Sequence, residues 1–239
     1  MTRLGVNIDH VATVRNARGS FHPDPFTIAK HVTKCGAHSV TIHLREDRRH
    51  IKDADVVKIC KNKKIITNLE ISLNKKIINI ALKNRPNFIC IVPEKRKEVT
   101  TEGGLNLIKN KKKIKTIISL FNKKNIRTSL FVDPTLKDIK IAKELNATCV
   151  ELHTGKISNL VKENKNYKNE YLKIKKCSKL GVKLGIEVHA GHGLDYKTTS
   201  ILSKIKEITE FNIGHFIIGE SLTHGLKKTI KAFKKITNK

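Results

Sequence analysis

Charged and ionisable side chains follow several apolar runs of this sequence. The densest group is HLREDRRH (residues 43–50), directly behind the apolar SVTI of residues 39–42. Its histidines can exchange protons near neutral pH, and its arginine forks suit the oxygens of a phosphate group. Three interpretations are open for this stretch: a solvated turn, a patch for nucleic acid, or one wall of an active site.

Other apolar runs are also followed by ionisable residues or by a glycine turn. These residues are Glu70 in TNLE, Glu151 and His153 in ELHTG, His192 in HAGHGL, and Gly214 and His215 in NIGHF. A carboxyl group in a partly apolar cavity can have its pKa raised towards neutrality, which suits a general base. A glycine turn that opens a helix offers backbone N–H groups to an anion. Together these residues indicate acid–base chemistry on a phosphorylated compound.

Metal, nucleophilic and Schiff-base chemistry fit the same residues less well. The histidines lack HExxH or facial-triad spacing, and the neighbouring arginines would oppose a bound cation. The sequence has no GxSxG elbow, and its lysines crowd helices and loops instead of strand ends. We therefore expect a phosphate-handling enzyme that uses histidine and glutamate, with no metal and no bound cofactor.

Eight β-rich runs position these residues, with lysine-rich amphipathic stretches between them. The runs cover residues 4–9, 39–44, 65–71, 88–93, 127–133, 149–154, 183–190 and 211–215. Eight such units in 239 residues predict an α/β fold, a single (β/α)8 TIM barrel with additional short helices that spans residues 1–239 as one domain. An open doubly wound sheet is the competing fold, but no GxGxxG turn follows the first run.

Aliphatic and polar side chains alternate within these runs. In the sixth run, for example, Val150 and Leu152 alternate with Glu151. The aliphatic face is expected to pack against the outer helices, while the polar face points into the barrel and opens at its mouth. His189, three residues before His192, is expected to face the mouth as well.

Composition limits the partners of the chain. The formal net charge of +28 comes from lysine runs without interleaved aromatic residues, so these runs predict solvated helix faces and no specific nucleic-acid site. Nonspecific attraction to polyanions stays open. Five scattered cysteines without a CxxC pair indicate reduced thiols. With no membrane-length apolar run and no signal-peptide pattern, we expect a cytoplasmic protein without a membrane partner.

The segment PEKRKEVTTEGGLN (residues 93–106) is long, charged and contains a pair of glycines. A loop of this length within a compact fold is typical of a lid over an active site.

Seven motifs occur in the order found in the pyridoxine 5'-phosphate synthase family, which they closely resemble: GVNIDHVATVRNARG, TIHLREDRRHI, NLE, VPEKRKEVTTEGGL, ELHTG, AGHGL and NIGHFIIG. The resemblance implies a (β/α)8 barrel that condenses 1-deoxy-D-xylulose 5-phosphate with 3-amino-2-oxopropyl phosphate. The products would be pyridoxine 5'-phosphate, inorganic phosphate and water. It also implies a homo-octamer that needs no cofactor.

The same resemblance implies a role for each matching residue. His43 and Glu70 would accept protons, His192 would donate one, and Glu151 would stabilise a transition state or orient a substrate group. The residues that would hold the deoxyxylulose phosphate are Asp9, His10, Arg45, His50 and Thr100. Those that would hold the aminoketone phosphate are Asn7, Arg18, Gly193, Gly214 and His215. His189 stays outside the catalytic set, and Glu46, Asp47, Arg48 and Arg49 are expected to fix their loop through local ion pairs.

Two other functions stay open at this point. A sugar-phosphate isomerase or aldolase without a metal would use the same barrel mouth. A basic nucleic-acid-binding protein would instead bind duplex or single strands with an affinity that falls as salt rises.

Overall fold

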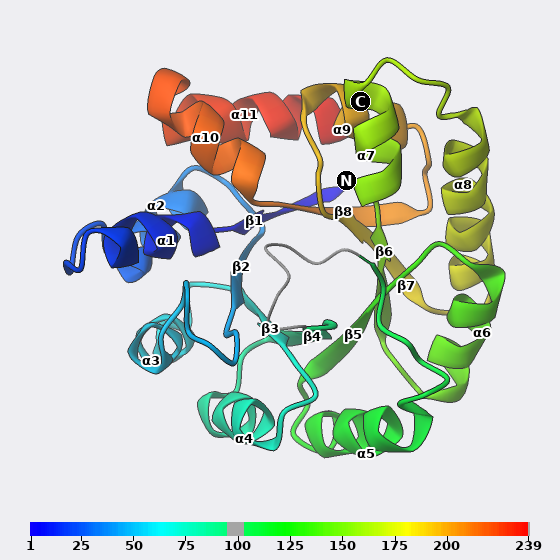
Figure 1. Ribbon diagram of the computed structural model, residues 1–239, viewed down its shortest axis with the longest axis horizontal. Helices are drawn as coiled ribbons and strands as arrows, with labels where there is room; N and C mark the ends of the chain where they lie inside the picture. The colour runs from blue at the N-terminus through cyan, green and yellow to red at the C-terminus, as the bar shows by residue number, and fades with distance from the viewer. Residues whose placement is uncertain (95–102, 239) are drawn as a thin grey trace.

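The strands of the protein form a closed barrel. A computed structural model describes residues 1–94 and 103–238. Eight parallel strands pair in sequence order, and the last pairs with the first (Figure 1). They are β1 (Arg3–Asn7), β2 (Ser39–His43), β3 (Thr67–Ile71), β4 (Phe88–Ile91), β5 (Arg127–Val132), β6 (Cys149–His153), β7 (Glu187–Gly191) and β8 (Ile208–Ile213). The predicted (β/α)8 barrel is confirmed.

Helices surround this ring of strands in Figure 1. They are α1 (Asp9–Ala17), α2 (Pro25–Lys34), α3 (Asp53–Lys61), α4 (Lys75–Asn84), α5 (Lys111–Asn122), α6 (Leu136–Glu144), α7 (Gly155–Lys162), α8 (Lys168–Lys183), α9 (Tyr196–Leu202), α10 (His215–His224) and α11 (Leu226–Thr237). Two helices follow each of β1, β6 and β8, which supplies the expected additional helices. None of the helices in the described ranges is long and apolar enough to cross a membrane.

Helix α11 shows why the lysine runs form helices. Ile230 and Phe233 are fully buried one turn apart, and Lys227, Lys228 and Lys231 are exposed between and before them. Apolar residues spaced by three or four positions give a helix one buried stripe and leave the lysines in solvent. The interpretation of these runs as solvated helix faces is therefore confirmed for α11.

The alternation within the strands separates two environments. Aliphatic side chains such as Ile42 and Leu69 are fully buried on the helix side. The interior of the barrel is unusually polar, and its buried polar residues include Ser39, Thr41, Asn68, Ser129, Glu151, Glu210 and Asn212. Hydrogen bonds between strands satisfy part of this interior, as between Ser39 and Glu210 (3.2 Å). The polar face points inward, as the sequence predicts.

Strands β7 and β8 differ most from their expected bounds. The apolar run 183–190 begins inside α8, which ends at Lys183, and the turn at Gly185 (φ 70°) separates it from β7. Strand β8 begins at Ile208, three residues before the expected start, and ends at Ile213. Gly214 and His215 open α10, which confirms the expected glycine turn at the start of a helix. The buried Glu210, paired with Arg3, makes the first half of β8 look polar in sequence.

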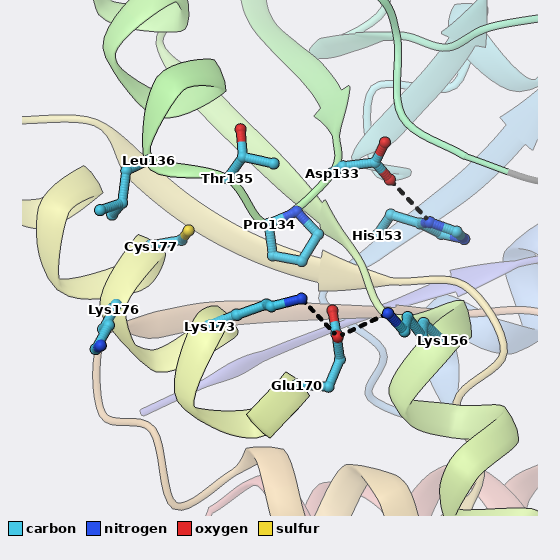
Figure 2. A pocket seen from close by; sticks show the side chains of 10 residues that line it. All are labelled: Asp133, Pro134, Thr135, Leu136, His153, Lys156, Glu170, Lys173, Lys176 and Cys177. Carbon is cyan, nitrogen blue, oxygen red and sulfur yellow. Dashed lines mark hydrogen bonds and ion pairs between the residues drawn. The ribbon is translucent and has the colours of Figure 1, made fainter. Parts of the chain in front are cut away.

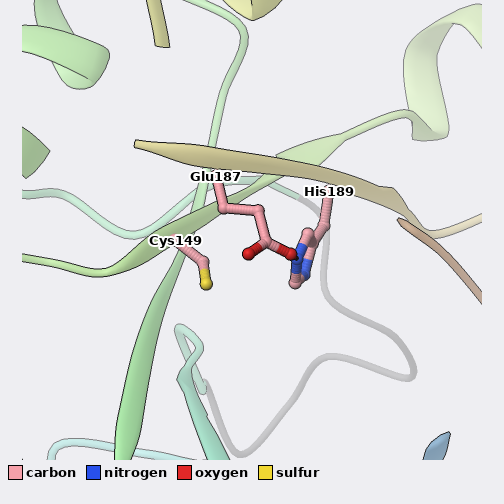
Figure 3. A group of neighbouring side chains, drawn as sticks. All are labelled: Cys149, Glu187 and His189. Atoms are coloured by element: carbon pink, nitrogen blue, oxygen red, sulfur yellow. Dashed lines mark hydrogen bonds and ion pairs between the residues drawn. The ribbon is translucent and has the colours of Figure 1, made fainter. Parts of the chain in front are cut away.

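An ion-pair network lies at the N-terminal end of the barrel. Arg3 pairs with Glu187 and Glu210, and Arg127 pairs with Glu187. Figure 3 shows Cys149 and His189 close to Glu187, with the potential metal-binding atoms of the three within 4.8 Å of one another. Two guanidinium groups already neutralise Glu187, so this group is arranged for ion pairing and not for a cation.

His189 joins this network and does not face the mouth. Its Nε2 lies 2.9 Å from Glu187 Oε1 and 3.2 Å from Arg3 Nη2, both at the starts of their strands. The expectation that His189 faces the mouth is therefore wrong. His189 lies on the same inward face as Glu187, as alternation predicts, but alternation alone does not give the depth of a side chain along the barrel axis.

Candidate active site

The C-terminal ends of the first three strands bring Asp9, His43 and Glu70 together. His43 ends β2 and lies opposite Glu70 of β3, while Asp9 opens α1 directly after β1. Asp9 Oδ1 accepts a hydrogen bond of 2.8 Å from the backbone N–H of His43. His43 Nδ1 lies 3.7 Å from Glu70 Oε2. Three titratable groups from different chain segments thus meet at the mouth, as the sequence predicts.

Burial raises the pKa of both carboxyl groups in this trio. Desolvation is the largest cause for Glu70, and the nearby carboxyl groups of Glu151 and Asp9 raise its pKa further, well above the ordinary range. For Asp9, desolvation outweighs the opposing effects of His43, Asn7 and Arg45. A carboxyl group that can hold a proton next to an imidazole is suited to proton exchange.

Glu151 lies in β6 inside the barrel. Asn212 of β8 donates a hydrogen bond of 2.7 Å to its Oε2. Burial, the largest cause, raises the pKa of Glu151 to about 7, against the lowering effects of His189 and Asn212. A Cβ on Gly191 would lie 2.0 Å from Glu151 Oε1, so a larger residue at this position would displace the Glu151 carboxyl group. Asn212 is not among the predicted site residues, although alternation along FNIG places it on the inward face.

Glu151→Gln is expected to stabilise the fold more at pH 8 than at pH 5. The carboxyl group ionises near pH 4.5 when unfolded and near 7 when folded, so wild-type stability falls as pH rises between these values. Glutamine cannot ionise and still accepts the bond from Asn212. The stabilisation at pH 8 should exceed that at pH 5 by about 2 kcal/mol in urea unfolding. An equal change at both pH values would contradict the raised pKa.

Three histidines face one another beside the start of α10. The ring centroid of His10 lies 4.9 Å from that of His215 and 6.0 Å from that of His50. Burial, followed by the effects of His10 and Arg45, lowers the pKa of His50 to about 4. Burial and His215 lower the pKa of His10. An anion bound among these rings would favour their protonated forms, so the group is suited to a phosphate.

Asn7 and Gly214 lie at the same edge of the mouth. Asn7 Nδ2 donates a hydrogen bond of 2.9 Å to Asp9 Oδ2. Gly214 is the N-cap of α10, and a Cβ there would lie 2.9 Å from Asn7 Cβ. The ten-residue helix α10 therefore begins against β1, with its first backbone N–H groups beside the three histidines.

His192 and Gly193 form a left-handed turn after β7. Both have positive φ, 79° at His192 and 75° at Gly193, and a non-glycine residue adopts this conformation only under constraint. Thr154 Oγ1 holds the turn by donating to the carbonyl oxygen of His192 (2.7 Å). Burial, followed by the charges of His153 and Lys162, lowers the pKa of His192 to about 4. A neutral His192 can donate a proton only through its ring N–H, or after an anion raises its pKa.

Arg45 is buried at the mouth and has N–H donors that are not used in hydrogen bonds to the described residues. Its side chain is 5% exposed, and its Nε lies 3.6 Å from Asp47 Oδ1 and 3.8 Å from Glu94 Oε1. Its Nε and Nη2 lack hydrogen-bond partners among the described residues. Buried guanidinium donors of this kind are available to a ligand.

The other charges of residues 43–50 hold their loop. Arg49 pairs with Asp47 at 2.7 Å, and Arg48 pairs with Asp53 at 2.9 Å. Arg48 Nη1 also donates to the carbonyl oxygen of Arg45 (2.7 Å). The expected ion pairs are confirmed for Asp47, Arg48 and Arg49, whereas the side chain of Glu46 accepts a hydrogen bond from Ser72.

Two predicted substrate-binding residues are not placed at the site by the structure. Arg18 is the exposed C-cap of α1, and no hydrogen bond or ion pair joins it to another predicted site residue in the described ranges. Thr100 and most of the expected lid, residues 95–102, lie outside the described residues.

A pocket of about 460 Å³, lined by residues that include Asp133, His153 and Glu170, adjoins the mouth. None of the sequence patterns described above predicts this pocket. Figure 2 shows Glu170 between Lys156 and Lys173, with both ion pairs at 3.4 Å. His153 borders this pocket, where its Nδ1 lies 3.3 Å from Asp133 Oδ1. Its ring centroid also lies 5.1 Å from that of His192, so His153 separates the pocket from the mouth.

Comparison with known proteins places this site in a family. The model of the family described as pyridoxal phosphate biosynthesis protein PdxJ matches residues 4–239. The chain belongs to the PdxJ family. It is 93% identical over 239 residues to pyridoxine 5'-phosphate synthase of Pelagibacter ubique (strain HTCC1062), covering 100% of both chains. It is 47% identical to the enzyme of the same name from Zymomonas mobilis (strain ATCC 31821 / ZM4 / CP4), covering 97% of this chain and 90% of the other.

More distant solved structures share the barrel of this PdxJ family member. Thiamine phosphate pyrophosphorylase from Pyrococcus furiosus superposes with a TM-score of 0.64 at 10% identity, covering 99% of this chain and 96% of the other. A phosphoribosylanthranilate isomerase from Thermotoga maritima gives 0.60 at 13% identity, covering 100% and 99%. At these identities the likeness shows the fold alone.

Proposed function

We propose that the protein condenses 1-deoxy-D-xylulose 5-phosphate with 3-amino-2-oxopropyl phosphate to give pyridoxine 5'-phosphate, inorganic phosphate and water. Membership of the PdxJ family over residues 4–239 supports this activity most strongly. The meeting of His43, Glu70 and Asp9 at the barrel mouth supports it chemically.

The reaction requires many proton transfers, and the mouth offers groups for them. Forming a pyridine ring from two ketones takes imine formation, enolisation, loss of phosphate, loss of water and ring closure, and each step moves protons. His43 and Glu70 accept protons and His192 donates one. Glu151 stabilises a transition state or orients a substrate group. The amine comes from the substrate, so neither a lysine of the enzyme nor a cofactor or metal is required.

The two phosphorylated substrates use different parts of the mouth. Asp9, His10, Arg45, His50 and Thr100 hold the deoxyxylulose phosphate. Asn7, Arg18, Gly193, Gly214 and His215 hold the aminoketone phosphate. The buried donors of Arg45 and the helix start at Gly214 support two separate anion sites.

Product analysis tests this function. Purified protein with both substrates is expected to yield fluorescent pyridoxine 5'-phosphate and equimolar phosphate, and neither substrate alone should give product. Isomerisation or cleavage of a single sugar phosphate without these products would favour the alternative, a metal-independent isomerase or aldolase.

The wider setting of the enzyme is also a proposal. Residues 1–239 act as one domain, and the protein works in the cytoplasm as a homo-octamer without a specific nucleic-acid or membrane partner. Phe21, 88% exposed before α2, and Leu222, 87% exposed on α10, are apolar groups that subunit contacts would cover. Sedimentation analysis of the purified protein measures the assembly, and a monomer would contradict it.

A further inference from the structure

Glu94 lies at the mouth and approaches His43 from the side opposite Glu70. It follows β4, and its side chain is 3% exposed. Its Oε2 lies 3.7 Å from His43 Nε2, while Glu70 Oε2 lies 3.7 Å from His43 Nδ1. Each ring nitrogen of His43 therefore faces one carboxyl group.

The carboxyl group of Glu94 is held in place by two further groups. Its Oε1 accepts a hydrogen bond of 2.8 Å from the backbone N–H of Glu46 and lies 3.8 Å from Arg45 Nε. Glu46 is tied in turn to the end of β3, because Ser72 Oγ donates to its Oε1 at 2.9 Å. Glu94 thus has a fixed position relative to both β2 and β3.

The two facing atoms of His43 and Glu94 have no other hydrogen-bond partner in the described part of the chain. His43 Nε2 and Glu94 Oε2 are buried, and neither has a hydrogen-bond partner among the described residues. Buried polar atoms without partners are rare in folded proteins. Catalytic hydrogen bonds are often long in a ligand-free site and shorten when substrate binds.

The two carboxyl groups differ in their protonation. Burial opposes ionisation of Glu94, but the nearby His43 ring, the hydrogen bond from the backbone of Glu46 and the charge of Arg45 give a net lowering of its pKa. Burial raises the pKa of Glu70 well above its ordinary range. The surroundings of Glu94 thus favour an ionised carboxylate facing Nε2, whereas burial of Glu70 favours the protonated form of the carboxyl group facing Nδ1.

We propose that Glu94 is a positioning residue: when the His43 ring carries a single proton, Glu94 keeps that proton on Nε2 and directs the Nδ1 lone pair at Glu70. In this arrangement the proton of Glu70 can move to Nδ1. His43 becomes an imidazolium ion beside the Glu94 carboxylate, and Glu70 becomes a carboxylate that can accept a substrate proton. This inference rests on the proposed roles of His43 and Glu70.

Glu94→Gln tests the inference with little change of shape. The amide oxygen can still accept from the backbone of Glu46, but the amide N–H₂ can donate to His43 Nε2 and so favours the proton on Nδ1. We expect kcat to fall about tenfold to a hundredfold, with a smaller change in KM, because misorientation at a reacting group has effects of this size. Ring ¹⁵N NMR, with the His43 signal assigned by its loss in His43→Gln, should show the proton move from Nε2 to Nδ1.

Two further variants make the experiment decisive. Asp47→Asn removes another carboxylate near Arg45 without touching His43, and it should leave the His43 tautomer and the pH profile of kcat unchanged. Glu94→Asp keeps the charge and should retain the Nε2 tautomer with a smaller loss of kcat, and it decides the question if Glu94→Gln does not fold. Wild-type protein that makes no pyridoxine 5'-phosphate would refute the proposed function. An active wild type whose tautomer and pH profile survive in Glu94→Gln would refute only the role of Glu94.

Discussion

Glu70→Gln is expected to lower kcat by about 10²- to 10⁴-fold, the usual contribution of a general acid–base group. The side chain lies in β3 opposite His43, and burial raises the pKa of its carboxyl group well above the ordinary range. Because the base must be ionised, the wild-type rate should rise with pH as this group loses its proton. Glutamine cannot ionise, so this limb of the pH profile should vanish while substrate affinity survives.

The controls for Glu70→Gln separate chemistry from folding. Removing a buried ionisable carboxyl group should not lower stability, so thermal unfolding of the variant should match or exceed that of the wild type. Glu144→Gln removes a surface carboxylate that pairs with Lys111 and should retain wild-type kcat. Near-normal turnover by a folded Glu70→Gln protein would exclude Glu70 as the base.

Arg45→Ala is expected to weaken the affinity for deoxyxylulose phosphate by about a hundredfold or more, since truncating one partner of a buried charge pair has effects of this size. The guanidinium is nearly fully buried and has donors without partners in the described part of the chain. Its removal also takes away the guanidinium that lies 3.8 Å from the Glu94 carboxylate. Isothermal titration with deoxyxylulose phosphate measures the loss.

Arg45→Lys is the matched variant for this effect. Lysine keeps the positive charge but lacks the planar fork that binds two phosphate oxygens at once. We expect an intermediate affinity, closer to that of Arg45→Ala if the fork is essential. The role of Arg45 in substrate binding would be refuted by wild-type affinity in Arg45→Ala.

The barrel could be predicted from the sequence because its signals, side-chain alternation within a strand and the repeated strand–helix unit, lie within short stretches of chain. Alternation in β6, with Val150 and Leu152 outside and Glu151 inside, follows from the two-residue period of a strand. Strand ends then converge because the strands of a closed parallel barrel all point the same way. His43 and Glu70 were found in this way, and the pairing of β2 with β3 brings them together.

The remaining features depend on contacts between distant segments. Glu94 lies in a charged stretch where nothing in the sequence distinguishes it from its neighbours, and only the fold brings it to His43. His189 points towards Glu187 and Arg3 at the N-terminal end of the barrel. A buried imidazole requires such polar partners, and Arg3 is far from it in sequence. The start of β8 was missed because Glu210 is a buried charge, and its partner Arg3 is 207 residues away in sequence.

A crystal structure of the Glu70→Gln variant with deoxyxylulose phosphate tests most directly whether the barrel mouth is the active site. We expect the phosphate against Arg45, His10 and His50, with the carbonyl end of the sugar within hydrogen-bond reach of His43. Density for the sugar phosphate in the pocket beside Glu170, or among Arg3 and Arg127 at the opposite end of the barrel, would contradict it.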